Sequence, residues 1–138
     1  MQINISTNSL DNKNRLIIPT SHRDILPKTD KVVFMCETDI NFNIQSMLAY
    51  ERRYEYFQEK LMELLASGKI TYEEMQKQLD KYNLNTYAQT NIDNNYRITI
   101  PELLMDKYQL SKKVLIARSN DHIKIFKNEE DLNTYRTL

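Results

Sequence analysis

The chain contains the motif Asp11-Asn12-Lys13-Asn14-Arg15-Leu16-Ile17-Ile18-Pro19, and it contains this motif twice. The second copy is Asp93-Asn94-Asn95-Tyr96-Arg97-Ile98-Thr99-Ile100-Pro101, displaced by 82 residues. The same displacement continues without a gap as far as Asp39 and Asp121. Such self-similarity determines the architecture of a fold, because each copy forms one supersecondary unit. The duplication therefore predicts two equivalent half-domains in one chain.

Each copy has the pattern of two strands joined by a polar loop, then a short helix and two further strands. Leu16 with Ile18, and Ile98 with Ile100, alternate at the period of a strand with one buried face. Proline then ends each strand, since it cannot donate a ladder hydrogen bond but suits the first turn of a helix. The expected strands are 3–10, one from Arg15, 32–36 and 41–44 in the first copy, and 87–92, one from Arg97, 114–118 and 122–126 in the second. The expected helices are 20–26 and 102–108.

A helical hairpin is predicted between the two copies. Its first helix, 45–66, carries one apolar stripe, consisting of Tyr50, Tyr54, Phe57, Leu61 and Leu64. Ser67-Gly68 ends this helix, and Thr71-x-x-Glu74 forms a capping box for the next one, with Ile70 able to pack on Met75. The buried face expected for the second helix consists of Tyr72, Met75, Leu79 and Tyr82. Ordinary core packing explains the aromatic stripe better than a ligand-binding box does. The hairpin could pack within the chain or against a neighbouring subunit. A last helix is expected at 128–135.

The bulk composition places the chain among globular proteins of about one domain. The 41% of hydrophobic residues suffices for a packed core. Its formal net charge is zero, with 19 basic and 19 acidic residues. This balance counts against a monomer that binds nucleic acid, since Lys and Arg supply most non-specific affinity for phosphate. It leaves open an oligomer that presents a few basic loops many times over. Only one glycine is present, so Asn and Asp must form most tight turns.

The N-terminal residues lack the charged and apolar regions of a secretory signal, and no stretch is apolar enough to span a membrane. A soluble, cytoplasmic protein is expected. The one cysteine, Cys36, excludes an intrachain disulfide and lies in an apolar run, which favours an inert core residue over a reactive thiol.

The repeated Asp-x-x-x-Arg motif has a chemical logic of its own. The aspartate can accept backbone N–H bonds inside a tight turn and can hold the arginine by a charge-assisted contact. The arginine then presents a planar set of donors that suits phosphate or the O6 and N7 atoms of guanine. The candidate DNA-binding residues are Asp11, Asn12, Lys13, Asn14 and Arg15 in the first loop and Asp93, Asn94, Asn95 and Arg97 in the second. The alternative is that both ion pairs only brace the turns. Two equivalent copies favour a binding surface.

With these motifs in place, residues 8–19 and the second copy resemble the MraZ family of bacterial regulators. The resemblance covers both half-domains, the helical insert and the C-terminal helix, and it is strongest at the two motifs. It implies a mainly β fold with helices (α+β), namely a pseudo-two-fold, swapped-hairpin β-barrel of the AbrB type. The half-domains would be residues 1–46 and 85–138, with the insert at 47–84, together forming one compact unit.

The resemblance also implies a function. Proteins of this family form ring-like homo-oligomers and bind direct repeats upstream of the division and cell-wall genes, usually as repressors. Double-stranded DNA and further copies of the chain would be the partners, at the nucleoid. The DNA-facing residues carried over by motif are Asp11, Lys13, Arg15, Asp93 and Arg97, with Arg15 as the main contact and Asp11 as the residue that orients it.

The chain departs from the family where glycine usually precedes each arginine, because these positions hold Asn14 and Tyr96. Asparagine tolerates the left-handed conformation, whereas tyrosine does not favour it. The second loop is therefore expected to have a different backbone shape, or to place Asn95 in the strained position. Because the second loop also lacks a counterpart of Lys13, the first loop is expected to bind DNA more strongly.

Two other classes of function compete with DNA binding. An enzyme is disfavoured because His22 and His122 lie in non-equivalent places, and no His-x-x-x-His, Cys-x-x-Cys or Gly-rich phosphate loop is present. No catalytic residue, metal, cofactor or small-molecule substrate is expected. An antitoxin of the same fold usually has one half-domain followed by a disordered toxin-binding tail, whereas two half-domains and a closing helix are expected here. The alternative that stays open, because the net charge is zero, is a non-catalytic, oligomeric protein-binding scaffold or an antitoxin-like module of the same fold.

Overall fold

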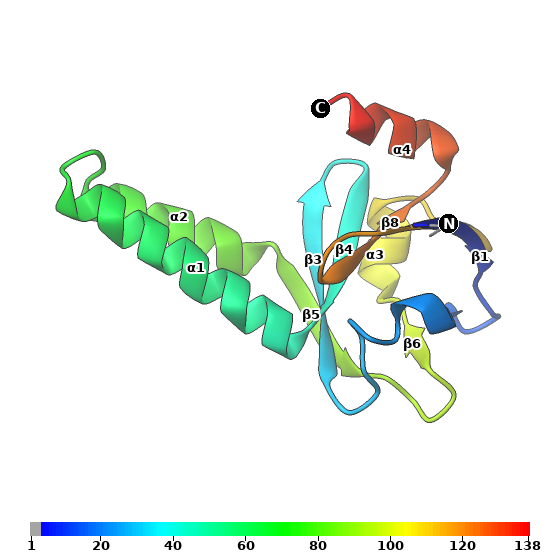
Figure 1. Ribbon diagram of the computed structural model, residues 1–138. Coiled ribbons are helices and arrows are strands. Elements are labelled where there is room, and N and C mark those ends of the chain that lie inside the picture. The colour runs from blue at the N-terminus through cyan, green and yellow to red at the C-terminus, as the bar shows by residue number, and fades with distance from the viewer. Residues whose placement is uncertain (1–3) are drawn as a thin grey trace.

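The computed structural model describes residues 4–138, which form a β-rich α+β fold (Figure 1). The elements in chain order are β1 (Ile5–Ser9), β2 (Arg15–Ile17), the 3-10 helix η1 (Thr20–His22), β3 (Lys31–Thr38), β4 (Asn41–Ser46), α1 (Met47–Ala66), α2 (Tyr72–Leu84), β5 (Thr86–Asn91), β6 (Arg97–Thr99), α3 (Glu102–Lys107), β7 (Lys113–Arg118), β8 (His122–Phe126) and α4 (Glu129–Arg136). The expected fold class, mainly β with helices, is confirmed.

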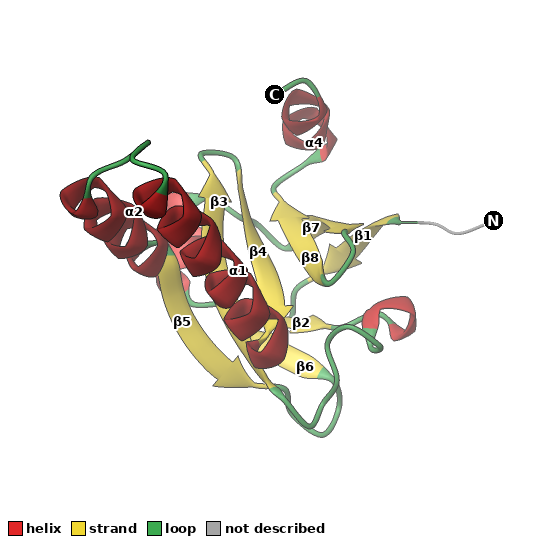
Figure 2. Ribbon diagram, turned by 60° about the vertical axis from the view of Figure 1, so that its left-hand side comes forward, coloured by secondary structure: helices red, strands yellow, loops and turns green. Residues whose placement is uncertain are grey.

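The two repeats exchange strands with each other. The six-stranded sheet has the order β1-β7-β8-β4-β3-β5 (Figure 2), and all of the neighbouring strands are antiparallel. Strand β1 of the first repeat pairs with β7 of the second, and β5 of the second pairs with β3 of the first. The registers are equivalent, because Ser9 faces Lys113 in one pair and Asn91 faces Lys31 in the other. The sheet thus has pseudo-two-fold symmetry, as expected for swapped hairpins.

Strands β2 and β6 form a separate two-stranded ribbon beside the six-stranded sheet (Figure 2). In this ribbon Leu16 faces Ile98, and these residues are separated by the repeat displacement of 82, so the pseudo-two-fold axis passes between them. A single bridge between Leu10 and Leu16 joins the ribbon to the chain before it. Within the described residues, strand pairing alone does not close the predicted barrel.

One hydrophobic core fills the space between the sheet and the ribbon. Alternate residues of the strands point into it, and its most buried members are Leu16, Ile18, Leu26, Val32, Phe34, Phe42, Ile44, Leu104, Ile116 and Ile123. The inward-pointing residues of the ribbon therefore anchor it, while its outward-pointing residues are left at the surface.

Helices α1 and α2 form a hairpin that projects from the sheet as an arm (Figure 1). Leu61, Met75 and Leu79 form its small core, and Tyr82 packs against Phe57 with ring centroids 5.1 Å apart. The arm therefore packs on itself within one chain. The prediction for Tyr72 is wrong, because 62% of this residue is exposed and it lies outside that core.

The signals predicted at Gly68 and Thr71 are confirmed. The Thr71 side chain accepts a bond from the Glu74 N–H at the start of α2. The Ser46 side chain caps α1 in the same way, by accepting a bond from the Ala49 N–H, and this cap was not predicted. Gly68 has φ = 74°, a left-handed conformation that glycine adopts without cost. The bonds from Gly68 to Leu65 and from Lys69 to Leu64 complete a Schellman motif.

Several boundaries differ from the sequence expectation. The helix predicted at 20–26 is reduced to the 3-10 turn η1, because Pro27 disfavours a helical conformation at Leu26 and the segment begins with the weak helix formers Thr20, Ser21 and His22. Strand β4 runs to Ser46, so α1 begins two residues later than predicted. Residue Ile3, the predicted start of the first strand, lies outside the described residues.

Candidate nucleic-acid interface

The two Asp-x-x-x-Arg loops have the same backbone structure. In the first, Asp11 Oδ1 accepts bonds from the backbone N–H groups of Lys13, at 2.8 Å, and Arg15, at 2.9 Å. In the second, Asp93 Oδ1 accepts bonds from Asn95 and Arg97, both at 2.8 Å. Each aspartate thus stabilises the turn that the motif predicts, because its carboxylate accepts hydrogen bonds from two backbone N–H groups of the loop.

Each aspartate also fixes the direction of its arginine. Arg15 Nε donates to Asp11 Oδ2 at 2.6 Å, and Arg97 Nε donates to Asp93 Oδ2 at 2.8 Å. No hydrogen bond to any described residue occupies the Nη1 or Nη2 atoms of these arginines. With 28% of each arginine side chain exposed, both guanidinium groups are held in place and keep donors for an external acceptor.

The aspartates remain ionised at neutral pH. Mainly because of the backbone hydrogen bond from Arg15, the pKa of Asp11 is lowered to about 2. The corresponding bond from Arg97 lowers the pKa of Asp93. Each arginine is therefore paired with a full negative charge. The Nη donors of each arginine can still bind a base edge or a phosphate oxygen directionally.

The expectation of a different second loop is wrong. Tyr96 has φ = 57° and Asn14 has φ = 58°, so both loops place the residue before the arginine in the left-handed region. Tyrosine is tolerated there because its ring packs against the core and lies under two cations. The Arg23 guanidinium carbon is 4.0 Å from the ring centroid, and the Lys28 Nζ is 5.0 Å from it.

The β2–β6 ribbon joins the two loops directly. Ile18 N–H donates to the Tyr96 carbonyl at 2.8 Å, and Ile100 N–H donates to the Asn14 carbonyl at 2.9 Å. Strand pairing places Arg15 opposite Thr99, and Ile17 opposite Arg97. These four residues alternate with Leu16 and Ile98, which are buried at the pseudo-two-fold axis. They form the outer face of the ribbon, which we call the ribbon face.

The structure thus brings the nine predicted residues together as two loops at opposite ends of one ribbon. Asn12, Lys13, Asn94 and Asn95 are exposed at the loop tips, and Asn12 accepts a bond from Lys112 Nζ at 2.9 Å. This surface also includes five residues that the sequence did not predict as contacts, namely Ile17, Arg23, Lys28, Thr99 and Lys112. Strand alternation could have found Ile17 and Thr99, because it points them away from Leu16 and Ile98.

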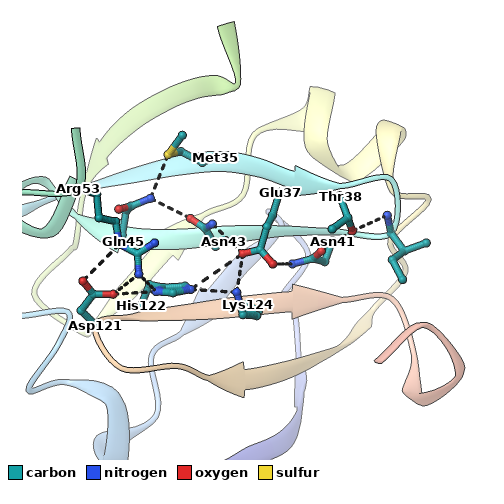
Figure 3. A network of polar contacts seen from close by, with 11 residues as sticks. Met35, Glu37, Thr38, Asn41, Asn43, Gln45, Arg53, Asp121, His122 and Lys124 are labelled. Carbon is teal, nitrogen blue, oxygen red and sulfur yellow. Dashed lines mark hydrogen bonds and ion pairs between the residues drawn. The ribbon is translucent and has the colours of Figure 1, made fainter. Parts of the chain in front are cut away.

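A second polar cluster lies on the opposite face of the six-stranded sheet (Figure 3). Lys124 Nζ donates to Glu37 Oε1 at 2.5 Å, and Asn43 Nδ2 donates to the same oxygen at 3.1 Å. Arg53 of α1 donates to the Asp121 carboxylate and also contacts His122 Nδ1, at 2.6 Å. This cluster connects the base of the arm to the sheet.

The charges in this cluster are satisfied by one another. Burial raises the pKa of Glu37, but the hydrogen bonds from Lys124, Tyr135 and Asn43 outweigh it, so the pKa falls to about 2. Burial lowers the pKa of His122. Among the described residues, no three His, Cys, Asp or Glu side chains gather as a metal site. The cluster is best explained as a structural joint. Cys36 is partly buried against the main core.

None of the helices described between residues 4 and 138 is both long and apolar enough to cross a membrane.

No family model matches this chain. It is 26% identical, over 129 residues, to proteins named transcriptional regulator MraZ from two strains of Ureaplasma parvum serovar 3. A protein of the same name from Ureaplasma urealyticum serovar 10 has the same identity. These alignments cover 94% of this chain and 83% of each relative. The resemblance noted at the two motifs is confirmed, at a low level of identity, along nearly the whole chain.

Proposed function

We propose that this chain, a distant relative of the MraZ transcriptional regulators, is itself a transcriptional regulator that binds double-stranded DNA through the ribbon face and its two flanking loops. The relatives' name supports regulation of transcription. The contact surface is our inference from the geometry of the loops.

The observation that carries this proposal is the pair of arginines preset in the same way at opposite ends of one ribbon. In each loop the aspartate occupies Nε, so the remaining guanidinium donors point outward with little conformational freedom left to lose. The major groove of DNA admits a two-stranded ribbon, and bidentate arginine is the commonest specific contact to guanine.

The zero net charge fits this proposal if several copies act together. One chain makes few phosphate contacts, so its non-specific affinity is low. A ring-like homo-oligomer would present the loops repeatedly and gain affinity for DNA that carries direct repeats. We place such repeats upstream of the chain's own division and cell-wall operon, which the protein would repress, in the cytoplasm at the nucleoid.

A mobility-shift titration tests the proposal. The promoter DNA upstream of the chain's own gene is compared with a scrambled sequence of equal length, at two salt concentrations. Specific, salt-sensitive binding supports regulation. Equal binding of both DNAs, or no binding, contradicts it. The result would then favour the protein-binding scaffold, which the balanced charge also fits.

Variants assign the contacts. Arg15→Ala is expected to abolish the preference for the promoter, because the side chain is partly exposed and its remaining donors face outward. Arg97→Ala is expected to weaken binding less, since the second loop has Asn95 in place of Lys13. Arg52→Ala removes the same charge from an exposed position on α1 and should leave binding unchanged. Thermal unfolding followed by circular dichroism completes the test. An Arg15→Ala protein that unfolds would show that the pair is a brace.

A further inference from the structure

Ile17 is the last residue of β2 and belongs to the ribbon face, with 55% of its surface exposed. Its neighbours Leu16 and Ile18 are fully buried, so the strand is held firmly while Ile17 points outward. A single exposed apolar residue is common on protein surfaces and is not by itself a site. This residue is different in its position, because it neighbours both of the arginines that the loops hold: it faces Arg97 across the ribbon and lies two residues from Arg15 on its own strand.

The cross-strand neighbours define that position. Ile17 faces Arg97 across the ribbon, and directly paired side chains have Cβ atoms about 5 Å apart. Arg15 is two residues away along the same strand and is therefore on the same face. Thr99 faces Arg15 and occupies the equivalent place in the second repeat. Each arginine thus has an apolar or methyl-bearing neighbour across the ribbon.

Resting on the proposed function, we propose that Ile17 determines part of the DNA specificity by contacting the C5-methyl group of a thymine beside a base read by an arginine. That methyl is the apolar group that a base pair presents in the major groove, and an aliphatic side chain is its complement. An isoleucine side chain cannot contribute a hydrogen bond or a charge to a phosphate contact, whereas it can pack against a thymine methyl group. Thr99 offers one smaller methyl group, so its contribution is weaker.

Replacing thymine by deoxyuridine removes the methyl group and leaves every hydrogen bond of the base pair intact. The first experiment substitutes deoxyuridine for each thymine of the bound promoter repeat in turn and measures the affinity of the wild-type chain. At one or more positions the affinity should fall about threefold to fivefold, the amount expected for one buried methyl group.

The second half of the experiment repeats the titration with Ile17→Ser, and with Thr99→Ser as the matched control. Ile17→Ser should bind the thymine and deoxyuridine DNAs equally at the sensitive position, whereas Thr99→Ser should keep most of the difference there. Because Ile17 is exposed, the serine variant should keep the wild-type circular dichroism spectrum and elution volume.

Each outcome decides a separate question. A wild-type chain that does not distinguish promoter from scrambled DNA contradicts both the proposed function and this inference. Specific binding that is insensitive to deoxyuridine everywhere, or equally sensitive in the wild type and Ile17→Ser, overturns this inference alone. A change in the elution volume of Ile17→Ser would show that the residue packs against another copy of the chain, and would also overturn it.

Discussion

Tyr96 has an unusual combination of backbone conformation and residue type. The left-handed region costs a residue with a Cβ atom about 1–2 kcal/mol, and the chain accepts this cost in an otherwise regular turn. The ring compensates by packing against the core and beneath Arg23, whose Nε donates to the Ile18 carbonyl at 3.0 Å. Since Arg23 and Lys28 come from the first repeat, one repeat stabilises the loop of the other.

This arrangement predicts that the ring, rather than the hydroxyl group, stabilises the loop. Tyr96→Phe keeps the packing and the cation–π contact, so the free energy of unfolding should be unchanged. Tyr96→Ala keeps the backbone strain but loses the ring, and should lower the free energy of unfolding by about 2 kcal/mol. Urea denaturation of both variants measures the difference. An alanine variant as stable as the wild type would show that the ring contributes nothing.

The sequence predicted single residues well where local chemistry decides their role. Asp11 and Asp93 form the predicted turns because the carboxylate needs only donors within four residues. The failure at Tyr96 has a different cause. The residues that stabilise its ring, Arg23 and Lys28, are about 70 positions away in the sequence, and no local pattern connects them with it.

At the scale of elements, the arm has its own hydrophobic core, and an ion pair helps to hold its base to the rest of the chain. Its own small core closes between α1 and α2, while Arg53 connects α1 to Asp121 at the start of β8. Burial raises the pKa of Asp121, but the hydrogen bonds from Arg53 and His122 lower it to about 2. The pair is therefore ionised at neutral pH, although both side chains are more than a third exposed and solvent screens their attraction.

Removing this joint should loosen the base of the arm without unfolding the chain. Arg53→Ala is expected to lower the free energy of unfolding by roughly 1 kcal/mol, the upper range for a partly exposed ion pair. Amide hydrogen exchange should increase in the first turns of α1 and little in the ribbon. Arg52→Ala, on the same helix but exposed, serves as the control. Equal effects of the two substitutions would contradict a specific role for Arg53.

Element prediction succeeded where a long periodic pattern or a cap was present, as in α1, α2 and their boundary at Gly68. It failed for η1, because a short helix depends on tertiary packing more than on its own residues. It also assigned Tyr72 to the buried face by spacing alone. This residue is the first of α2, and the packing at that end of the arm is supplied by Ile70 instead.

At the scale of the whole molecule, neither repeat can complete a sheet alone. The edge strands β1 and β5 each pair with the other repeat, and β4 pairs with β8 across the centre. The duplication predicted this pseudo-symmetry, and the resemblance predicted the exchange of strands. Among the described strands, no ladder hydrogen bonds close the barrel. Sequence periodicity shows which residues of a strand are buried, but it does not show whether the two edge strands of a sheet meet.

This interleaving predicts cooperative folding of the two repeats. Fragments 1–84 and 85–138, produced separately, should each lack a stable monomeric sheet, because each would expose unpaired strands and half of the core. Mixed in equal amounts, they should recover the β-sheet signal in circular dichroism and the dispersed amide spectrum of the intact chain. A folded, monomeric 85–138 fragment would contradict this expectation.

The tandem arrangement has a consequence for orientation. Two identical half-domains would make both ends of the ribbon alike, and such an object is unchanged by a half-turn. Joining the halves in one chain has allowed the ends to diverge, with Lys13 and Ile17 at positions equivalent to Asn95 and Thr99. The loops keep one shape while their side chains differ, so the ribbon has a head and a tail. A surface of this kind can distinguish a sequence from its reverse complement, and copies that follow one another along a repeat array would all point the same way.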